Sequence, residues 1–234
     1  MLPKLNSGFL ELGGDTVPFE LRRSHRRRTL GLTVTTQQIR IHAPSWTPRA
    51  EIGYFVQQQL DWLRHAWSRM QAKIAPLDAE RTHYSYLGRG LTWEFHLSLF
   101  AEVRRTGKVL HVYATAPDAA EGLVRIWLHA RAKKLLAWRL TRIARRLGRA
   151  PTGFTLSNAQ TQWGSCTHSG HIRLNWRLVQ APIALIDYVA AHELAHLVHL
   201  DHSPAFWKQV TVLCPEVMVR RATLRKLSVA LFQI

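Results

Sequence analysis

Hydrophobic and polar residues alternate along the N-terminal part of the chain, between Asp15 and about Pro44. The alternating apolar positions lie on both sides of a polar TTQQ segment and are Leu30, Leu32, Val34, Ile39, Ile41 and Ala43. A period of two places every second side chain on the same face of a strand. The pattern therefore predicts a β-hairpin with one buried face.

Two longer segments have the spacing of amphipathic helices. In the first, Thr47 is the expected N-cap, Pro48 is the expected first helical residue, and apolar side chains recur every three or four positions until about Pro76. The second runs from about Pro117 to Gly148, a residue suited to a C-cap. A basic stripe adjoins its apolar stripe. We interpret it as a solvated face, with an anion-binding surface as the alternative.

The C-terminal half contains further strand and helix patterns. Residues 170–178, GHIRLNWRL, alternate apolar and polar side chains and predict a strand, whereas residues 181–200 are apolar on all sides and predict a buried helix. Ser203 and Pro204 fit the N-cap and the first position of another helix, and a last helix is expected from about Pro215.

These elements predict an α+β fold. We expect a β-rich N-terminal lobe with one long helix, residues 1–115, packed on a helical C-terminal lobe, residues 116–234. Because no flexible linker divides the two lobes in the sequence, one continuous domain is the alternative.

Composition and charge limit the cellular locations and binding partners that we expect for this 234-residue chain. It has no apolar run near the ~20 residues needed to span a bilayer, and because its N-terminal residues lack a basic region followed by an apolar stretch, we expect no secretion signal. Only two cysteines are present, Cys166 and Cys214, so we expect a reducing, cytoplasmic location. The chain has 32 Lys and Arg residues and only 15 acidic residues, and the resulting formal charge of +17 attracts nucleic acid or another polyanion. An arginine-rich proteome is the other explanation of this charge.

His192 and His196 stand four residues apart on the apolar helix, about 40° apart around its axis and one turn apart along it. Two imidazoles in this relation can bind one tetrahedral zinc ion. Glu193 is placed to act as general base toward a metal-bound water, as HExxH sites require. Since burying these groups without a compensating role is costly, the pattern favours a catalytic metal site over histidines that only satisfy core hydrogen bonds.

Two histidines are candidates for the third ligand. On a continuous helix His199 lies close to His192 around the axis, but about 10.5 Å farther along it. His202 directly precedes the start of the next helix, and a turn there can bring its ring back to the site. We predict His202 as the ligand, with one position left open for water, and His199 as a partly buried residue. Asp201 is expected to orient an imidazole N–H.

Four segments carry a resemblance to a known family. They occur in one order at close spacing and are WGSC (163–166), GHIRLNWRL (170–178), APIALIDYVAAHELAHL (181–197) and DHSPAFW (201–207). Together they resemble the YgjP-like metallopeptidase domain family, zincins distantly related to the SprT/Spartan group, and the resemblance extends over nearly the whole chain. It implies a zinc ion held by His192, His196 and His202, with Glu193 as the catalytic base.

The resemblance also implies where a substrate binds. In a zincin-like lobe an extended peptide pairs with an edge strand beside the HExxH helix, and GHIRLNWRL is the candidate strand. The family pattern places substrate contacts near the cleft at Trp163, Ser165, Arg173 and Asn175. Gln162 stands where members commonly have a basic residue, so no contact is assigned there.

The expected function is that of a zinc-dependent metallopeptidase-type hydrolase. Water activated by zinc and Glu193 attacks a peptide carbonyl, and the +17 charge points to polypeptides associated with nucleic acid. One alternative is a metal-dependent hydrolase of nucleotide phosphoanhydrides, with arginines neutralising the phosphates. Another is a nucleic-acid-binding module with a structural zinc, which Glu193 disfavours because a structural site gains nothing from a general base.

Overall fold

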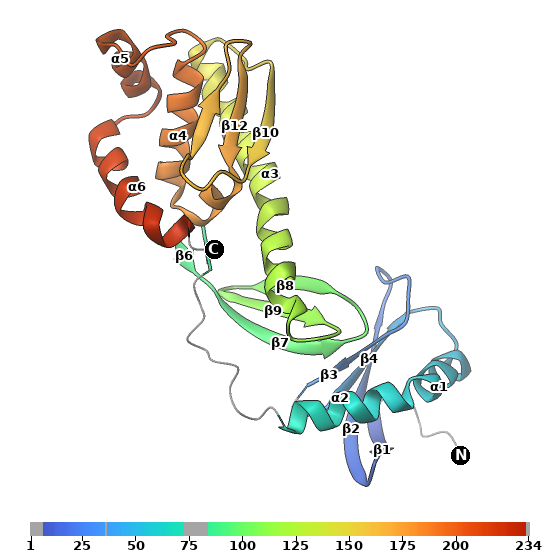
Figure 1. Ribbon diagram of the computed structural model, residues 1–234. Helices are drawn as coiled ribbons and strands as arrows, with labels where there is room; N and C mark the ends of the chain where they lie inside the picture. Colours follow the sequence, from blue (N-terminus) through green and yellow to red (C-terminus); the bar gives the residue numbers. More distant parts are fainter. Residues whose placement is uncertain (1–6, 36, 73–83, 233–234) are drawn as a thin grey trace. The chain divides into compact units, whose positions relative to one another are not determined.

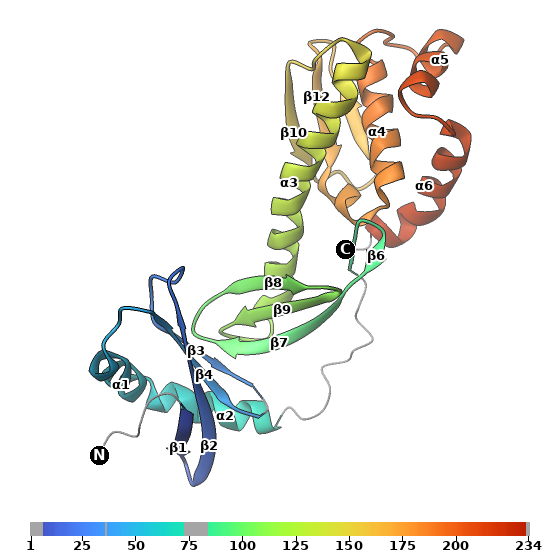
Figure 2. The ribbon, with the colours of Figure 1, turned by 180° about the vertical axis from the view of Figure 1, so that it is seen from behind.

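The computed structural model describes residues 7–35, 37–72 and 84–232, and its ribbon is drawn in Figures 1 and 2. The fold is a mixed α+β fold, as the sequence predicts. The described residues fold into two compact units. The first unit comprises those within Met1–Arg81 and Thr92–Val124, and the second comprises those within Thr82–Leu91 and Arg125–Ile234. The lobe boundary expected between residues 115 and 116 stays a prediction.

The first unit contains a seven-stranded sheet of strand order β1-β2-β4-β3-β7-β9-β8. Its strands are β1 (Ser7–Leu12), β2 (Asp15–Ser24), β3 (Gly31–Val34), β4 (Ile39–Pro44), β7 (Thr92–Ser98), β8 (Glu102–Thr106) and β9 (Val109–Ala114). β3 and β4 pair antiparallel, with Leu32 opposite Ile41 and Val34 opposite Ile39. These four side chains are fully buried. The expected hairpin with one buried face is confirmed.

Helices α1 (Arg49–Gln58) and α2 (Leu60–Ala72) cover the buried face of this sheet. Ile52 and Leu63 pack with the strand side chains in one apolar cluster. The sequence predicted a single helix here, and this was wrong. The N–H of Gln59 bonds to the carbonyl of Val56, three residues back, and this tighter turn separates the two helices.

The start of α1 also differs from its prediction by one residue. Pro48 has an extended backbone conformation, so it is the N-cap rather than the first helical residue, and no side chain caps the helix. Thr47 lies outside the helix. The end expected near Pro76 falls outside the described residues.

Helix α3 (Ala119–Leu147) begins in the first unit and continues into the second. Gly148 follows it with a positive φ of 71°, which is the expected C-cap conformation. Within the second unit, Leu128, Ala132 and Leu136 are buried. The predicted basic stripe is exposed and comprises Arg131, Lys134, Arg142 and Arg145.

The second unit has a three-stranded sheet of β10 (Gly153–Ser157), β11 (Gly164–Cys166) and β12 (His171–Asn175). The strand order is β10-β12-β11, so β12 is central and pairs on both sides. The expectation that GHIRLNWRL is an edge strand was therefore wrong. The strand at the edge of this sheet is β11, which begins at Gly164.

The strand in GHIRLNWRL is also shorter than predicted, because Asn175 ends it. Its side-chain oxygen accepts a hydrogen bond from the N–H of Arg177 and starts the 3₁₀ helix Trp176–Gln180. A small hairpin of β5 (Ser85–Tyr86) and β6 (Arg89–Gly90) lies beside this helix, since Ser85 Oγ donates to the carbonyl of Gln180.

Three helices complete the second unit: α4 (Ile183–Ala195), α5 (Pro204–Leu213) and α6 (Val217–Phe232). Asp187 of α4 and Arg139 of α3 form a largely buried ion pair that joins these two helices. Ser203 caps α5 by accepting from Phe206 N–H, with Pro204 in the first turn, which confirms that prediction. None of the helices in the described residues is long and apolar enough to cross a membrane.

Candidate metal centre

Three imidazoles converge at the C-terminal end of α4. His192 lies in the last turn, His196 is the C-cap, and His202 lies in the connection that precedes α5. Their ring centroids are 5.1 Å apart for His192 and His196, 5.1 Å for His192 and His202, and 4.9 Å for His196 and His202. The Nε2 atoms of His192 and His202 are 3.2 Å apart. One ligand atom from each ring lies within 4.8 Å of the other two.

The end of α4 explains how His202 reaches the other two rings. The helix stops at Ala195, and turns follow over residues 196–198, so His199 does not continue the helical face. The chain then reverses before the Ser203 cap. Phe206, fully buried in α5, supports the group, with its ring centroid 5.0 Å from His192, 4.6 Å from His196 and 4.8 Å from His202.

Hydrogen bonding fixes the orientation of His196. Its Nδ1 lies 3.0 Å from the carbonyl oxygen of His199, so the N–H donates there and Nε2 keeps its lone pair for a ligand. The Nδ1 of His192 is buried and has no hydrogen-bond partner among the described residues. Its Nε2, which faces His202, is the nitrogen directed at the shared centre.

The charge states of these imidazoles suit a metal ligand. Burial, followed by the neighbouring His196 and His202 rings, lowers the pKa of His192 to about 4. Burial also lowers the pKa of His196, although its bond to the His199 carbonyl acts in the opposite direction. Neutral imidazoles offer a free lone pair, so the donor set fits a divalent cation such as zinc.

Glu193 lies beside this group and is only 5% exposed. Burial raises the pKa of its carboxyl group to about 8. Gly164 of β11 packs against it, and a Cβ at Gly164 would lie 2.6 Å from both Cγ and Oε1 of Glu193. A divalent cation at the three imidazoles would favour the charged carboxylate, because an opposite charge nearby stabilises the ionised form.

A cleft of about 370 Å³ opens over the imidazoles and Glu193. Its other walls are Gly164, Ser165, Cys166, His168 and Leu200. A smaller hollow of about 240 Å³ adjoins it and is lined by Trp163, Tyr188 and Leu224, among others. Both hollows include Gly164, His192 and Glu193, so a ligand in either reaches the same centre.

Comparison with known proteins identifies the family of this chain. A family model described as the YgjP-like metallopeptidase domain matches residues 28–227. The chain belongs to the YgjP-like metallopeptidase family. Its membership makes it a metallopeptidase-type hydrolase and implies a divalent metal. A search of curated proteins finds no match.

Among solved structures, the chain is similar to the crystal structure of the metallopeptidase zymogen of Pyrococcus abyssi abylysin. The two sequences are 21% identical, the match covers 40% of this chain and 95% of the other, and the TM-score is 0.37.

In this YgjP-like chain, the residues predicted to contact substrate have different surroundings. Ser165 lines the cleft, and Arg173, opposite it in the β11–β12 register, is exposed. Trp163 borders the smaller hollow, donates from Nε1 to Ser228 Oγ at 2.9 Å and stacks on Phe232. Their substrate contacts stay predictions.

Asn175 is completely buried. Its amide nitrogen donates to the carbonyl oxygens of Ala159 at 2.7 Å and Gln162 at 3.0 Å. The residue therefore holds the segment that leads into Trp163 and β11, and its predicted substrate contact stays untested.

A further prediction concerns Asp201, at the edge of the site. Asp201 is exposed, and its Oδ1 accepts from Ser203 N–H at 3.4 Å, so it helps to shape the turn before α5. The group that orients an imidazole is the backbone carbonyl of His199, which sequence reasoning did not identify because every residue has one. The thiol of Cys166 also lines the cleft, and burial raises its pKa.

A second group of potential ligands lies in the first unit. Glu94 and His96 of β7 and His111 of β9 bring ligand atoms within 4.8 Å of one another. The Oε2 of Glu94 is 3.2 Å from Nδ1 of His111 and 3.8 Å from Nε2 of His96. The sequence pattern did not single out these residues, since the cross-strand register that joins them is not visible in spacing along the chain.

Proposed function

We propose that this protein is a zinc-dependent metallopeptidase in which His192, His196 and His202 hold the ion and Glu193 is the general base. The observation that carries the proposal is the convergence of three imidazoles beside a buried carboxylate. Two nitrogens bound to one zinc ion at about 2.0–2.1 Å with tetrahedral angles lie roughly 3.3 Å apart. The 3.2 Å between Nε2 of His192 and Nε2 of His202 fits this requirement.

In this proposal a bound zinc ion supplies a Lewis acid that polarises the peptide carbonyl and makes water more acidic. The protein's own residues do the rest. Glu193 accepts a proton from the attacking water and returns it to the leaving amine. Gly164 leaves the space in which the carboxylate lies, and the His199 carbonyl fixes the His196 ring. The cleft side remains open for substrate.

We place an extended peptide along β11, because this edge strand provides three residues of the cleft wall. Its backbone pairs with β12 on one side only. Pairing of a substrate backbone with the other side of β11 would need no particular substrate sequence. Ser165 lies on β11 and lines the cleft, and Arg173 is opposite it in the register, which is consistent with their predicted substrate contacts.

The charge of +17 supports substrates that are associated with nucleic acid, since such polypeptides are brought to a basic protein by their polyanionic partner. The two free cysteines favour a reducing compartment such as the cytoplasm.

The test compares zinc-loaded wild-type protein with Glu193→Gln on an unfolded polypeptide and on nucleoside triphosphates. Glu51→Gln, an exposed position of α1, is the matched control. We expect wild-type and Glu51→Gln to cleave the polypeptide, and Glu193→Gln to lose cleavage while keeping one zinc ion. Wild-type rates in Glu193→Gln would contradict the base assignment, and hydrolysis of the triphosphates alone would contradict the peptidase.

A further inference from the structure

One face of the seven-stranded sheet carries most of its charged side chains. Side chains at paired positions project to the same face, and the register links Arg22 of β2 to His42 of β4. Near the other edge of the sheet and on the same face, Arg104 of β8 pairs with His111 of β9. The opposite face holds Leu32, Ile41 and the helices α1 and α2. The charged face therefore lies on the side of the sheet away from these helices.

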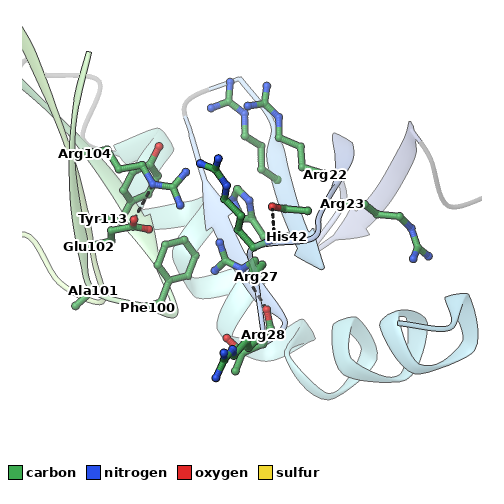
Figure 3. A pocket seen from close by; sticks show the side chains of 14 residues that line it. Arg22, Arg23, Arg27, Arg28, His42, Phe100, Ala101, Glu102, Arg104 and Tyr113 are labelled. Carbon is green, nitrogen blue, oxygen red and sulfur yellow. Dashed lines mark hydrogen bonds and ion pairs between the residues drawn. The ribbon is translucent and has the colours of Figure 1, made fainter. Parts of the chain in front are cut away.

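Arginines surround a hollow of about 570 Å³ on this face. Seven arginines, one histidine and a single glutamate line it, together with Phe100 and Tyr113. Figure 3 shows the arginines of β2 and the following turn on one side of the hollow, and Phe100, Glu102, Arg104 and Tyr113 on the other. The positive charge is concentrated at one place in the first unit and is not only spread over the molecule.

A second hollow of about 660 Å³ continues from the first. The two share Arg22, Arg40, Arg104 and Tyr113 in their walls. The continuous space is therefore longer than one phosphate group needs, and it suits an elongated anion that presents several charges in a row.

Acidic residues compensate only part of this charge. Glu20 lies 3.0 Å from Nε of Arg22 and 3.6 Å from Nε of Arg40, and Glu102 lies 2.7 Å from Nε of Arg104. Burial and then Arg27 and other arginines lower the pKa of His42 to about 4, which is the expected effect of a positive field. The guanidinium fork has the geometry for paired bonds to phosphate oxygens.

Aromatic rings lie among these cations. Phe100 and Tyr113 are half-buried and stack with their centroids 5.6 Å apart. Arg27 lies over the Phe100 ring at 4.4 Å, and Arg104 lies 5.9 Å from the Tyr113 ring. A basic groove interleaved with aromatic side chains is the arrangement that binds single-stranded nucleic acid, because phosphates contact the cations and bases stack on the rings.

We propose that these two hollows bind a single strand of nucleic acid without sequence preference, with the arginines on its phosphates and Tyr113 or Phe100 on a base. This inference does not depend on the peptidase activity, because every residue in it belongs to the first unit and none to the metal centre.

The surroundings favour this ligand over three others. Glu94, His96 and His111 line the second hollow, but Arg22, Arg40 and Arg104 line it too and oppose a bare cation. An acidic peptide supplies carboxylates but has no bases to stack on Tyr113 or Phe100. A lipid surface is broad, whereas the rings lie inside hollows.

The first experiment measures binding of a fluorescent 20-nucleotide single strand by anisotropy between 50 and 200 mM salt. With four phosphates contacted, we expect the dissociation constant to rise about 50-fold over this range. The triple variant Arg22→Gln, Arg28→Gln, Arg104→Gln removes three exposed cations of the first hollow and should lower the slope of log affinity against log salt by about 2.

The matched control is Lys133→Gln, Lys134→Gln, Arg145→Gln, which removes the same charge from exposed positions of α3. It should bind like the wild-type protein. If both triple variants weakened binding equally, the effect would come from net charge alone, and the proposal would be overturned. Unchanged binding by the first variant would also overturn it. Added chelator should leave binding of the strand unchanged. The experiment therefore distinguishes an error in the proposed metal centre from an error in the proposed nucleic-acid site.

A second experiment tests stacking. Tyr113→Leu keeps an apolar side chain and removes the ring, and it should weaken binding of the oligonucleotide about 5-fold or more. With an abasic strand of the same length, the variant and the wild-type protein should bind alike. Tighter binding of polyglutamate or of phosphatidylserine vesicles than of the oligonucleotide at equal salt would overturn the proposal in favour of a peptide or a membrane.

A mapping experiment needs no variant. Ultraviolet crosslinking of an iodouracil-containing strand to the wild-type protein should attach it to peptides containing residues 22–28 or 100–113. Crosslinks found only in residues 125–232 would place the strand on the other unit and contradict the proposal.

Discussion

Gly164 of β11 lies so close to Glu193 of α4 that a Cβ at this position would come within 2.6 Å of the carboxylate. The glycine thus provides the room in which the proposed base lies, at the edge strand proposed to bind the peptide.

Replacing Gly164 with alanine should displace the carboxylate while leaving the three imidazoles in place. We expect cleavage of an unfolded polypeptide to fall by roughly 10²-fold, the effect of misplacing a reacting group by about 1 Å, and zinc content to stay at the wild-type level. Gly122→Ala in α3 is the control, because a Cβ there would meet nothing within 4 Å beyond its chain neighbours and the adjacent backbone of its own helix. An active Gly164→Ala would show that the close approach does not position the base.

The two candidate third ligands give a paired prediction. His202→Ala should weaken zinc affinity by more than the 10–100-fold that losing an outer hydrogen-bond partner costs, because it removes a direct ligand. His199→Ala should keep zinc, since His199 contacts His196 through its backbone carbonyl, which alanine retains. Competition with a chelating dye measures both affinities. Loss of zinc in the His199 variant and not in the His202 variant would reverse the assignment.

Asn175 provides a test between structural support and substrate contact. Asn175→Ala removes a completely buried side chain that donates to the carbonyls of Ala159 and Gln162, and we expect a loss of about 1–3 kcal/mol in the free energy of unfolding. Asn175→Asp should cost more, because it places an acceptor against two carbonyl oxygens. Denaturant titration measures the loss. Unchanged stability with a raised KM would instead identify Asn175 as a substrate contact.

The Arg139–Asp187 pair should stabilise the second unit by joining α3 to α4. Because both side chains are largely buried, Asp187→Ala should lower the free energy of unfolding by about 1.5–3 kcal/mol. Asp61→Ala breaks the exposed Arg64–Asp61 pair and should cost about 1 kcal/mol or less. Similar losses in both variants would show that burial adds nothing to the first pair.

Local rules account for what the sequence predicted correctly. The alternation around Leu32 and Ile41 predicts a hairpin because each strand buries one face. Ser203 begins α5 through a local hydrogen bond, and Gly148 follows the end of α3 with a positive φ. The convergence of His192, His196 and His202 was also predictable, because the helical spacing and the turn before Ser203 are both visible in the sequence.

Features that depend on distant partners were not predictable. The central place of β12 follows from parallel pairing with β10 and antiparallel pairing with β11, and no spacing within GHIRLNWRL encodes it. The same holds for the arginine-lined hollows, which bring residues of β2, β4 and β8 together through the order of the sheet. The role of the His199 carbonyl is invisible in residue identity.

The most direct test of the account is a crystal structure of zinc-loaded protein with anomalous diffraction measured at the zinc edge. The account predicts one anomalous peak in the second unit, with Nε2 of His192, His196 and His202 at about 2.0–2.1 Å and a fourth position open toward the cleft. A peak that lacks His202, or a fourth protein side chain bound to the ion, would contradict it.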